Sequence, residues 1–169
     1  MSAARLGINK ELTTINNIIN TQVDCSARPF TPLKPMNRTY LINALEGIAT
    51  SDGYSFYSDS DERMSQQIKS YPAAWLQPPK FLEMEGRKHG KVTYSVTLHA
   101  MEAGARLTPA ERQQTWSRLE EDLVEMFSKL SDTERVVAVE QLKINHTTHT
   151  LTTHGEVAAT ATAEVVTFF

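Results

Sequence analysis

The chain has 169 residues, of which 40% are hydrophobic and 22% charged, and its 17 basic and 20 acidic residues give a formal net charge of -3 at pH 7. A chain of this length can bury a core that needs neither a disulfide nor a metal ion, and its single cysteine, Cys25, cannot form an internal disulfide. Proteins that hold nucleic acid through its phosphates usually carry a basic excess, so this composition argues against nucleic acid as a direct partner.

The first residues, MSAARLGINKEL, lack the apolar core of a signal peptide. No stretch approaches the roughly 18 consecutive apolar residues that a membrane-spanning helix needs. We therefore expect a soluble protein that is not secreted by that route and has no membrane partner. A lone cysteine fits a reducing cytoplasm or a particle that is assembled inside a cell.

Residues 9–23 carry apolar side chains at helical spacing, which predicts an amphipathic helix. These side chains are Leu12, Ile15, Ile18, Ile19 and Val23. Three prolines follow within residues 26–36, and they forbid a continuing helix and favour an extended connector. We therefore predict an N-terminal helix and proline-rich arm over residues 1–36 and an α+β domain over residues 37–169.

A second helix is predicted within residues 37–53, which end in a glycine. Its apolar residues at helical spacing are Tyr40, Leu41, Leu45 and Ile48. Residues 51–70 are polar, acidic and rich in turn formers, so we predict a long surface loop with one helical turn at residues 64–68. The carboxylates Asp59, Asp61 and Glu62 lack the glycine and the closing glutamate of a calcium loop, which favours a solvated loop over a metal site.

The segment YPAAWLQPPKF, residues 71–81, combines aromatic residues with prolines in a rigid apolar stretch. Such a stretch belongs either to the core, which we favour, or to a contact surface. Whether Trp75 is buried or exposed distinguishes the two.

A β-hairpin is predicted where KFLEME and KVTYSVTLHAM flank the glycine-containing GRKHG. Glu83 and Glu85 are two apart on the first strand and predict its outward face. On the second strand, alternate residues from Val92 to Ala100 predict one core face.

The clearest helix is predicted over residues 108–131. It opens with Thr108 as N-cap, a proline at the first helical position, and Glu111 placed to close a capping box. Its apolar stripe consists of Trp116, Leu119, Leu123, Met126, Phe127 and Leu130. Two strand patterns follow, RVVAVEQLKIN and GEVAATATAEVVTF. The predicted fold class is therefore α+β, a mostly antiparallel sheet packed against this main amphipathic helix, with N-terminal helices.

Candidate catalytic and metal-binding residues do not form a convincing site. His146, His149 and His154 do not converge on one ion along an extended strand. Cys25 lacks a local His or Gly context, and no serine occupies a nucleophile elbow. We therefore predict no catalytic residues, no cofactor and no bound metal, and a protein that is not an enzyme.

The order of these elements, with KVTYSVTLHAM before TWSRLEEDLVEMFSKL and LKINHTTHTLTTHGEVAATATAEVVTF after it, resembles the tail terminator and tail completion proteins of long-tailed bacteriophages. The resemblance covers residues 37–169 and is one of pattern, because this family has no sharp motif and no catalytic residues to carry over. It implies a virion structural protein that forms a homo-oligomeric ring, usually a hexamer, at the head-tail junction. Such a ring caps the tail tube protein, joins it to the head-side connector or neck protein, and is assembled in the host cytoplasm.

The last strand pattern runs to Phe169, and a final strand leaves an open edge unless another strand or subunit covers it. The residues that we predict at the subunit or tube interface are Trp75, Arg87, Lys88, Phe168 and Phe169. In the alternative, the terminal phenylalanines fold back onto their own sheet. A small cytoplasmic enzyme or ligand-binding domain, with a cleft between the sheet and the 51–70 loop, is the second functional class.

Overall fold

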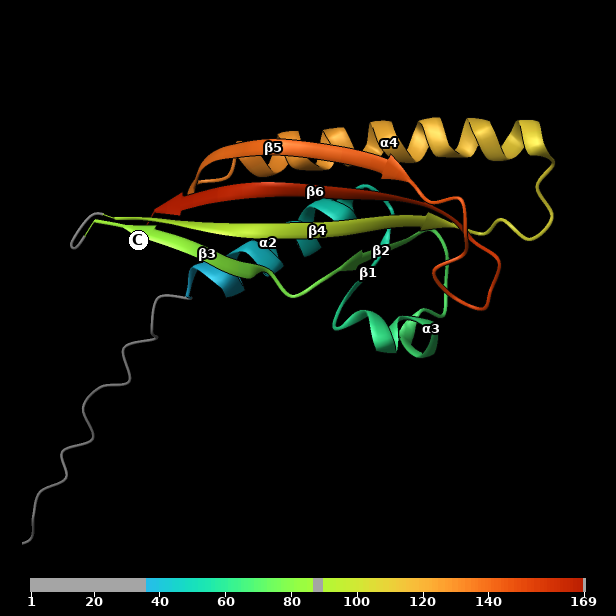
Figure 1. Ribbon diagram of the computed structural model, residues 1–169, viewed down its shortest axis with the longest axis horizontal. Coiled ribbons are helices and arrows are strands. Elements are labelled where there is room, and N and C mark those ends of the chain that lie inside the picture. Colours follow the sequence, from blue (N-terminus) through green and yellow to red (C-terminus); the bar gives the residue numbers. More distant parts are fainter. Residues whose placement is uncertain (1–35, 87–89, 169) are drawn as a thin grey trace, which may run out of the picture. The chain divides into compact units, whose positions relative to one another are not determined.

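Residues 36–86 and 90–168 are described in the computed structural model (Figure 1). The predicted helix of residues 9–23 and residues 26–35 of the predicted arm lie outside these ranges. The helices are α2 (Asn37–Ser51), α3 (Met64–Gln67), which follows a 3-10 turn at Asp61–Arg63, and α4 (Pro109–Ser131). The strands are β1 (Ser55–Ser58), β2 (Ala73–Leu76), β3 (Lys80–Glu85), β4 (Lys91–Glu102), β5 (Val136–His146) and β6 (Val157–Phe168).

Six strands form one sheet in which β1, β2, β4, β6 and β5 lie side by side, and β3 also pairs with β4. β2 pairs with residues 98–101 of β4, whereas β3 pairs with residues 91–95. Every pair is antiparallel except β1 with β2. The predicted α+β fold, a mostly antiparallel sheet packed against one main helix, is therefore confirmed. None of the helices in the described ranges is long and apolar enough to span a membrane.

The final strand lies inside the sheet. β6 pairs with β4 along its whole length, from Val157 opposite Glu102 to Phe168 opposite Lys91. Its other edge pairs with β5. Strands of the same chain thus cover both edges of β6, so of the two predicted alternatives it is another strand, and not a subunit, that closes the edges of this strand. Among the described strands, the open edges belong to β1, β3 and β5.

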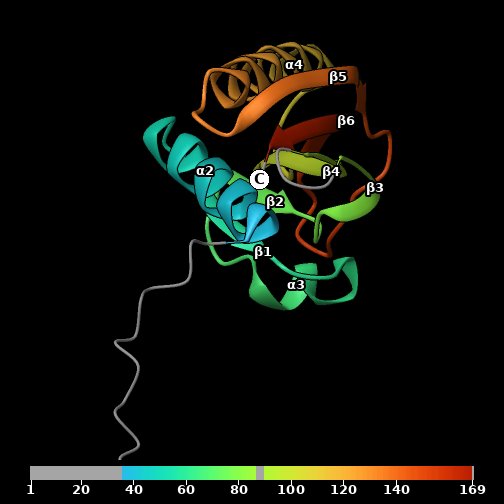
Figure 2. The ribbon, with the colours of Figure 1, turned by 90° about the vertical axis from the view of Figure 1, so that its left-hand side faces the viewer.

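α4 covers one face of the sheet, which we call the helix face (Figure 2). Thr108 Oγ1 accepts a hydrogen bond from Glu111 N at 3.3 Å, and Glu111 Oε2 accepts one from Thr108 N at 2.8 Å, so the predicted capping box is confirmed. The predicted stripe is buried except for Trp116, which is partly exposed. It packs on apolar side chains of β4 and β6, among them Leu98 and Ala161.

α2 completes the cover of the helix face (Figure 2). Its buried residues are Leu41, Leu45 and Ala49. The helix ends before Gly53, which adopts a φ of 87° that favours glycine. Lys129 Nζ of α4 lies 2.5 Å from Asp52 Oδ1, and Tyr54 donates a hydrogen bond to Asp122. The second predicted helix is therefore confirmed. The residues at and just after its end contact α4 through an ion pair and a hydrogen bond.

The opposite face of the sheet, which we call the open face, is covered near α3. A second apolar cluster there contains Met64, Ile68, Ala73, Trp75, Met101 and Ala158. The sequence predicted one core face for β4, but Met101 is fully buried and His99 is only 6% exposed on the other face. This half of β4 is therefore buried on both sides, because α3 packs where solvent was expected.

Two short strands were not predicted from the sequence. All four residues of β2 are buried, so the strand shows no alternation of polar and apolar residues. β1 has four residues within the predicted 51–70 loop and pairs in parallel with β2. The predicted helical turn in that loop is confirmed by α3. Strands this short depend on their neighbours in the sheet more than on local pattern.

The predicted hairpin is confirmed by the antiparallel pair of β3 and β4. Gly86 follows β3 and adopts a φ of 84°, as the glycine pattern predicted. Residues 87–89 lie outside the described ranges. The start of α2 and the described end of β6 lie at the same end of the sheet as this hairpin (Figure 1).

Candidate functional site

Most of the exposed apolar side chains lie at the end of the sheet where the hairpin is. Of the seven large apolar side chains exposed in the described residues, six lie on β3, at the start of α2, or where β5 begins and β6 ends. They are Phe81 (59% exposed), Met84 (56%), Leu82 (46%), Met36 (78%), Val137 (46%) and Phe168 (43%), and we call them the hairpin surface. The seventh is Val124 on α4, at 50%. Exposed apolar groups that are concentrated in one region of a surface are typical of sites where another protein binds.

β3 exposes its apolar residues because it is an edge strand. All six of its residues are exposed. Phe81 lies opposite Tyr94 and meets its ring edge-on, with 6.2 Å between the ring centroids. Met84 lies opposite Val92. Val92 and Tyr94 belong to the helix face of β4, so Phe81 and Met84 also lie on that face, in contact with water.

The start of α2 is attached to the end of β6 beside this surface. Asn37 Nδ2 donates to Thr167 Oγ1 at 3.0 Å and to the carbonyl oxygen of Phe168 at 3.2 Å. Thr167 is fully buried, and its Oγ1 donates to the carbonyl oxygen of Val92 at 3.1 Å. Three elements, α2, β6 and β4, are thereby joined where the hairpin surface lies.

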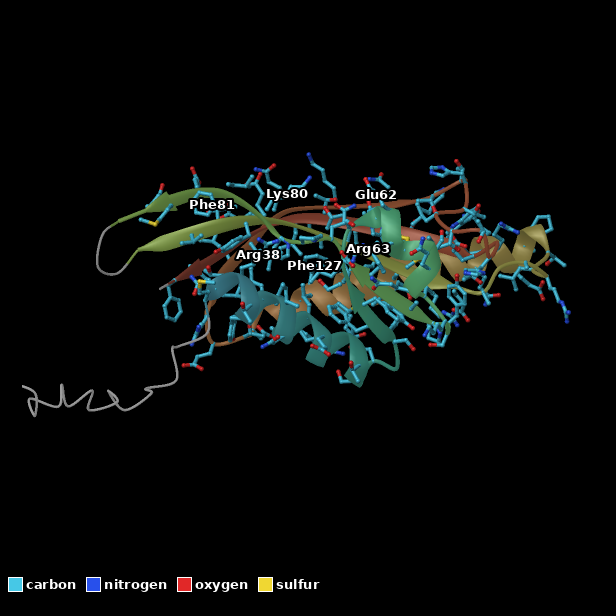
Figure 3. The ribbon with its side chains drawn as sticks, turned by 90° about the horizontal axis from the view of Figure 1, so that it is seen from below. Arg38, Glu62, Arg63, Lys80, Phe81 and Phe127 are labelled. Atoms are coloured by element: carbon cyan, nitrogen blue, oxygen red, sulfur yellow. The ribbon has the colours of Figure 1, made fainter. Side chains whose placement is uncertain are left out.

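A groove of about 530 Å³ lies between the segment that precedes α3 and the start of β3. Its walls include Arg38 of α2, Ser60 and Asp61, and residues 77–81. Figure 3 shows, from below, three of the residues in these walls, Arg38 on α2 and Lys80 and Phe81 on β3. The walls offer two cations, one carboxylate and one aromatic ring, a combination that can bind a small polar molecule or a peptide segment.

A buried histidine lies next to the groove. His99 Nδ1 lies 2.8 Å from Thr160 Oγ1, and His99 Nε2 lies 3.3 Å from Gln77 Nε2. Gln77 Nε2 also donates to Asp61 Oδ2 at 2.6 Å, which identifies this atom as the amide nitrogen. His99 Nε2 therefore accepts a hydrogen bond, and Nδ1 carries the proton that is donated to Thr160. Burial lowers the pKa of His99, while the charge of Asp61 opposes that shift.

This network suits a structural role better than proton transfer. A general base needs a lone pair that faces its substrate, and Gln77 occupies the lone pair of His99 Nε2. Asp61 is engaged as well, because its Oδ1 accepts a hydrogen bond from Trp75 Nε1 at 3.2 Å. The network attaches the segment before α3 to β2 and β4. Gln77 would have to move before His99 could take a proton from a molecule in the groove.

The predicted interface residues have different surroundings. Trp75 is fully buried in the cluster beneath α3 and stacks on Tyr57 with 6.4 Å between the ring centroids. Its placement in the core is thus confirmed, and its place among the interface residues is wrong. Phe168 is 43% exposed, and its backbone N donates to the carbonyl oxygen of Arg135 at 3.2 Å, so the side chain can meet a partner while the backbone stays in the sheet. The other predicted residues, Arg87, Lys88 and Phe169, lie outside the described residues.

The three late histidines have separate surroundings. His146 Nδ1 lies 3.1 Å from Glu120 Oε1, whereas His154 Nε2 lies 3.3 Å from the carbonyl oxygen of Ser65. His149 is exposed. Within residues 36–86 and 90–168, no three His, Cys, Asp or Glu side chains gather in a way that could hold a metal ion.

The exposure of β3 was not predicted. Assigning Glu83 and Glu85 to the outward face implied that Leu82 and Met84 face the core. Met84 does lie on the helix face, opposite Val92, but it is 56% exposed there. An irregularity in the pairing between Phe81 and Glu83 breaks the alternation, so that Phe81 lies on the same face as Met84. A signal was present in KFLEME, because apolar residues at both odd and even positions of a short hairpin strand suit an edge that meets a partner.

No protein-family model matches the chain, and no curated protein matches it at a significant level. Its function is therefore inferred from its own topology and surface.

Proposed function

We propose that the chain is a structural protein of a phage-like tail, which forms a ring that caps the tail tube and joins it to the head connector. The resemblance of element order over residues 37–169 suggests this role, and the hairpin surface is the observation that supports it. Such a protein works by self-association and turns over no substrate. Its functional part is then an exposed surface that a neighbouring copy covers.

Covering the hairpin surface would contribute favourable free energy to association. Full burial of a Phe, Leu or Met side chain contributes about 1.5–3 kcal/mol. Phe81, Leu82 and Met84 each expose roughly half of their surface, so covering all three contributes about 2–4 kcal/mol per contact. A closed ring repeats this contribution at every interface. An uncovered apolar edge, in contrast, invites uncontrolled pairing.

The first test is the mass of the purified full chain, measured by size exclusion with light scattering over a series of concentrations. We expect one discrete oligomer that appears as a ring by electron microscopy. The double variant Phe81→Glu, Met84→Glu should shift the oligomer to monomer and keep its circular dichroism spectrum. Gln66→Glu, an exposed change on α3, is the control.

A chain that stays monomeric at every concentration, with no ring under any condition, would count against this function. The genetic neighbourhood supplies an independent test. Genes for tail tube and tape-measure proteins beside the gene of this chain would support a tail role, and their absence would weaken it.

The groove favours a second candidate function, that of a small enzyme or ligand-binding domain. It lies between the sheet and the 51–70 segment, with Arg38 and Lys80 in its wall and His99 nearby. A thermal-shift screen of small anionic molecules tests this candidate. A compound that raises the melting temperature of the unaltered chain, but not of the Arg38→Ala, Lys80→Ala variant, would support it.

A further inference from the structure

We propose that a second copy of the chain pairs its β3 with the outer edge of β5, so that one sheet continues from copy to copy. This inference rests on the proposed self-association. It adds which two edges meet, in which direction their strands run, and which side chains the contact buries.

The edges of β3 and β5 are open in the described chain. β3 pairs only with β4, and β5 pairs only with β6, among the strands of residues 36–86 and 90–168. Backbone N–H and C=O groups along such edges are the usual place where a strand of another chain is added. The remaining open edge, that of β1, has only four residues. β3 and β5 therefore offer the longer edges for an added strand.

The strand directions allow the sheet to continue. From β3 through β4 and β6 to β5, each strand is antiparallel to the one before it, so β5 runs opposite to β3. A second copy that is rotated to bring its β3 beside β5 then forms another antiparallel pair. The helix faces of both copies stay on the same side. Because the contact joins two different surfaces of the chain, its repetition gives a closed ring or an open filament.

The exposed apolar residues lie on both of these edges. Phe81, Leu82 and Met84 belong to β3. Val137 belongs to β5, and Val124 lies on α4, the helix that packs over β5 and β6. A contact between two different edges requires exposed apolar surface at both of them. The β3 edge and the β5 edge each have such surface, and each can cover that of the other.

Val124 lies on the side of α4 that faces the β5 edge. His146, at the end of β5, has its Nδ1 3.1 Å from Glu120 Oε1 and its ring centroid 4.7 Å from that of Trp116. Residues four apart in a helix lie along one side, so Val124 continues the row of Trp116 and Glu120. The opposite side of α4 binds the end of α2 through an ion pair. Val124 therefore lies on the side of α4 that α2 does not contact, and it is half exposed.

A β3 strand that is added to this edge brings its apolar side chains beneath Val124. Phe81 and Met84 lie on the helix face of their own copy, and the rotation keeps that face next to the α4 of the neighbour. Leu142 of β5, which packs partly exposed against the core on the helix face, lies on the same edge. The added strand can thus bury Phe81 and Met84 of one copy against Val124 and Leu142 of the other.

Charged residues on the open face select among the possible registers. Glu83 lies on that face of β3, opposite Thr93 of β4. On β5, Glu140 lies opposite Glu164 and Lys143 lies opposite Thr162, so both belong to the open face. Opposite charges across neighbouring strands stabilise a pair, and like charges destabilise it. The register that sets Glu83 near Lys143 is therefore favoured over one that sets it near Glu140.

The test cross-links mixtures of single-cysteine variants of the full chain, each carrying Cys25→Ser. Met84→Cys places a thiol on β3, and Val124→Cys places one above the β5 edge. With a short bis-maleimide, we expect cross-linked dimers when the two variants are mixed. We expect no cross-linked dimers when either variant is treated alone. Glu125→Cys replaces Val124→Cys in the control, because Glu125 pairs with Lys129, which in turn pairs with Asp52 at the end of α2.

The outcomes separate this inference from the proposed function. A discrete ring without Met84-to-Val124 products, or with products of one variant alone, would overturn the β3–β5 pairing and leave self-association standing. A monomer that gives no products at any concentration would overturn both. As a second measurement, Val124→Glu should lower the oligomer fraction without lowering the melting temperature of the monomer, and Glu125→Gln should change neither.

Discussion

Asn37 and Thr167 lie 130 residues apart in the chain and are joined by a hydrogen bond of 3.0 Å from Nδ2 to Oγ1. Thr167 in turn donates to the carbonyl oxygen of Val92 on β4. This relay holds the start of α2, the end of β6 and the hairpin strand β4 together. The hairpin surface is therefore carried by a fixed framework, which favours a defined contact over a loose one.

Removing this link should weaken the fold without changing the core. We expect Asn37→Ala to lower the free energy of unfolding by about 0.5–1.5 kcal/mol, the usual contribution of a hydrogen bond. Urea unfolding at pH 7 measures the loss. Asn43→Ala, an exposed change on the same helix, should stay within about 0.5 kcal/mol of the unaltered chain. Equal losses in both variants would show that the link contributes nothing specific.

The buried face of α4 gives a prediction with a control at the next residue. Leu123 is fully buried, whereas Val124 is 50% exposed. Leu123→Ala opens a cavity between the helix and the sheet and should cost about 2–5 kcal/mol of stability. Val124→Ala should cost little in the monomer. An unchanged denaturation midpoint for Leu123→Ala would mean that the buried face is misassigned.

The N-cap of α4 should contribute measurably by itself. Thr108→Ala removes the side chain that accepts from Glu111 N, and we expect a loss of about 1 kcal/mol. Thr108→Ser keeps the hydroxyl and should recover most of that loss. Thermal and urea unfolding measure both variants, and equal stability of the Ala and Ser variants would contradict the capping role.

The buried His99 predicts that stability depends on pH below neutrality. Burial lowers the pKa of His99 in the folded chain, so the unfolded chain binds a proton more readily. The contribution of the neutral ring is present above the ordinary value of about 6.5 and is lost as the pH falls through the lower folded value. We expect His99→Gln to flatten the dependence of the melting temperature on pH between about pH 7 and pH 5. His149→Gln, an exposed change, should leave that dependence in place.

The buried Glu156 predicts a second loss of stability at lower pH. It is 2% exposed and accepts hydrogen bonds from Thr152 N at 2.6 Å and Thr152 Oγ1 at 2.5 Å. Burial raises the pKa of Glu156, but hydrogen bonds from the Thr152 hydroxyl and from nearby backbone N–H groups outweigh it, and the folded pKa is lowered. This contribution is therefore present above the ordinary value of 4.5 and is lost as the pH falls through the folded value.

Thr152→Val tests the carboxylate by removing one of its donors. Hydrogen bonds to charged groups contribute about 1.5–3 kcal/mol, so we expect a loss of that order at pH 7 and a smaller loss near pH 3. Urea unfolding at both pH values measures the difference. Thr153→Val, an exposed neighbour, is the control. A loss that is the same at both pH values would show that the ionised carboxylate is not involved.

Local sequence pattern was sufficient to predict those helices and strands whose caps, turns and apolar spacing are set by residues close together in the chain. Thr108 and Glu111 are three apart and form the cap of α4, and the apolar stripe of that helix needs only helical spacing to face the sheet. The hairpin of β3 and β4 and the long strands β5 and β6 were predicted for the same reason. Part of the candidate site could also be predicted, because Phe168 ends an alternating strand.

Only the tertiary structure decided which strands lie at the edges and which side chains meet water. β6 ends the described chain yet lies inside the sheet, because β4 and β5 pair with it from both sides over separations that no local pattern contains. The pairing of β2 with β4 and the packing of α3 bury Trp75, and the edge position of β3 leaves Phe81 and Met84 exposed. Burial of a strand depends on its neighbours in space, and those neighbours come from distant parts of the chain. The sequence by itself therefore determined the helices and the longer strands, whereas the short strands β1 and β2 and the exposed surface depended on the order of the strands in the sheet.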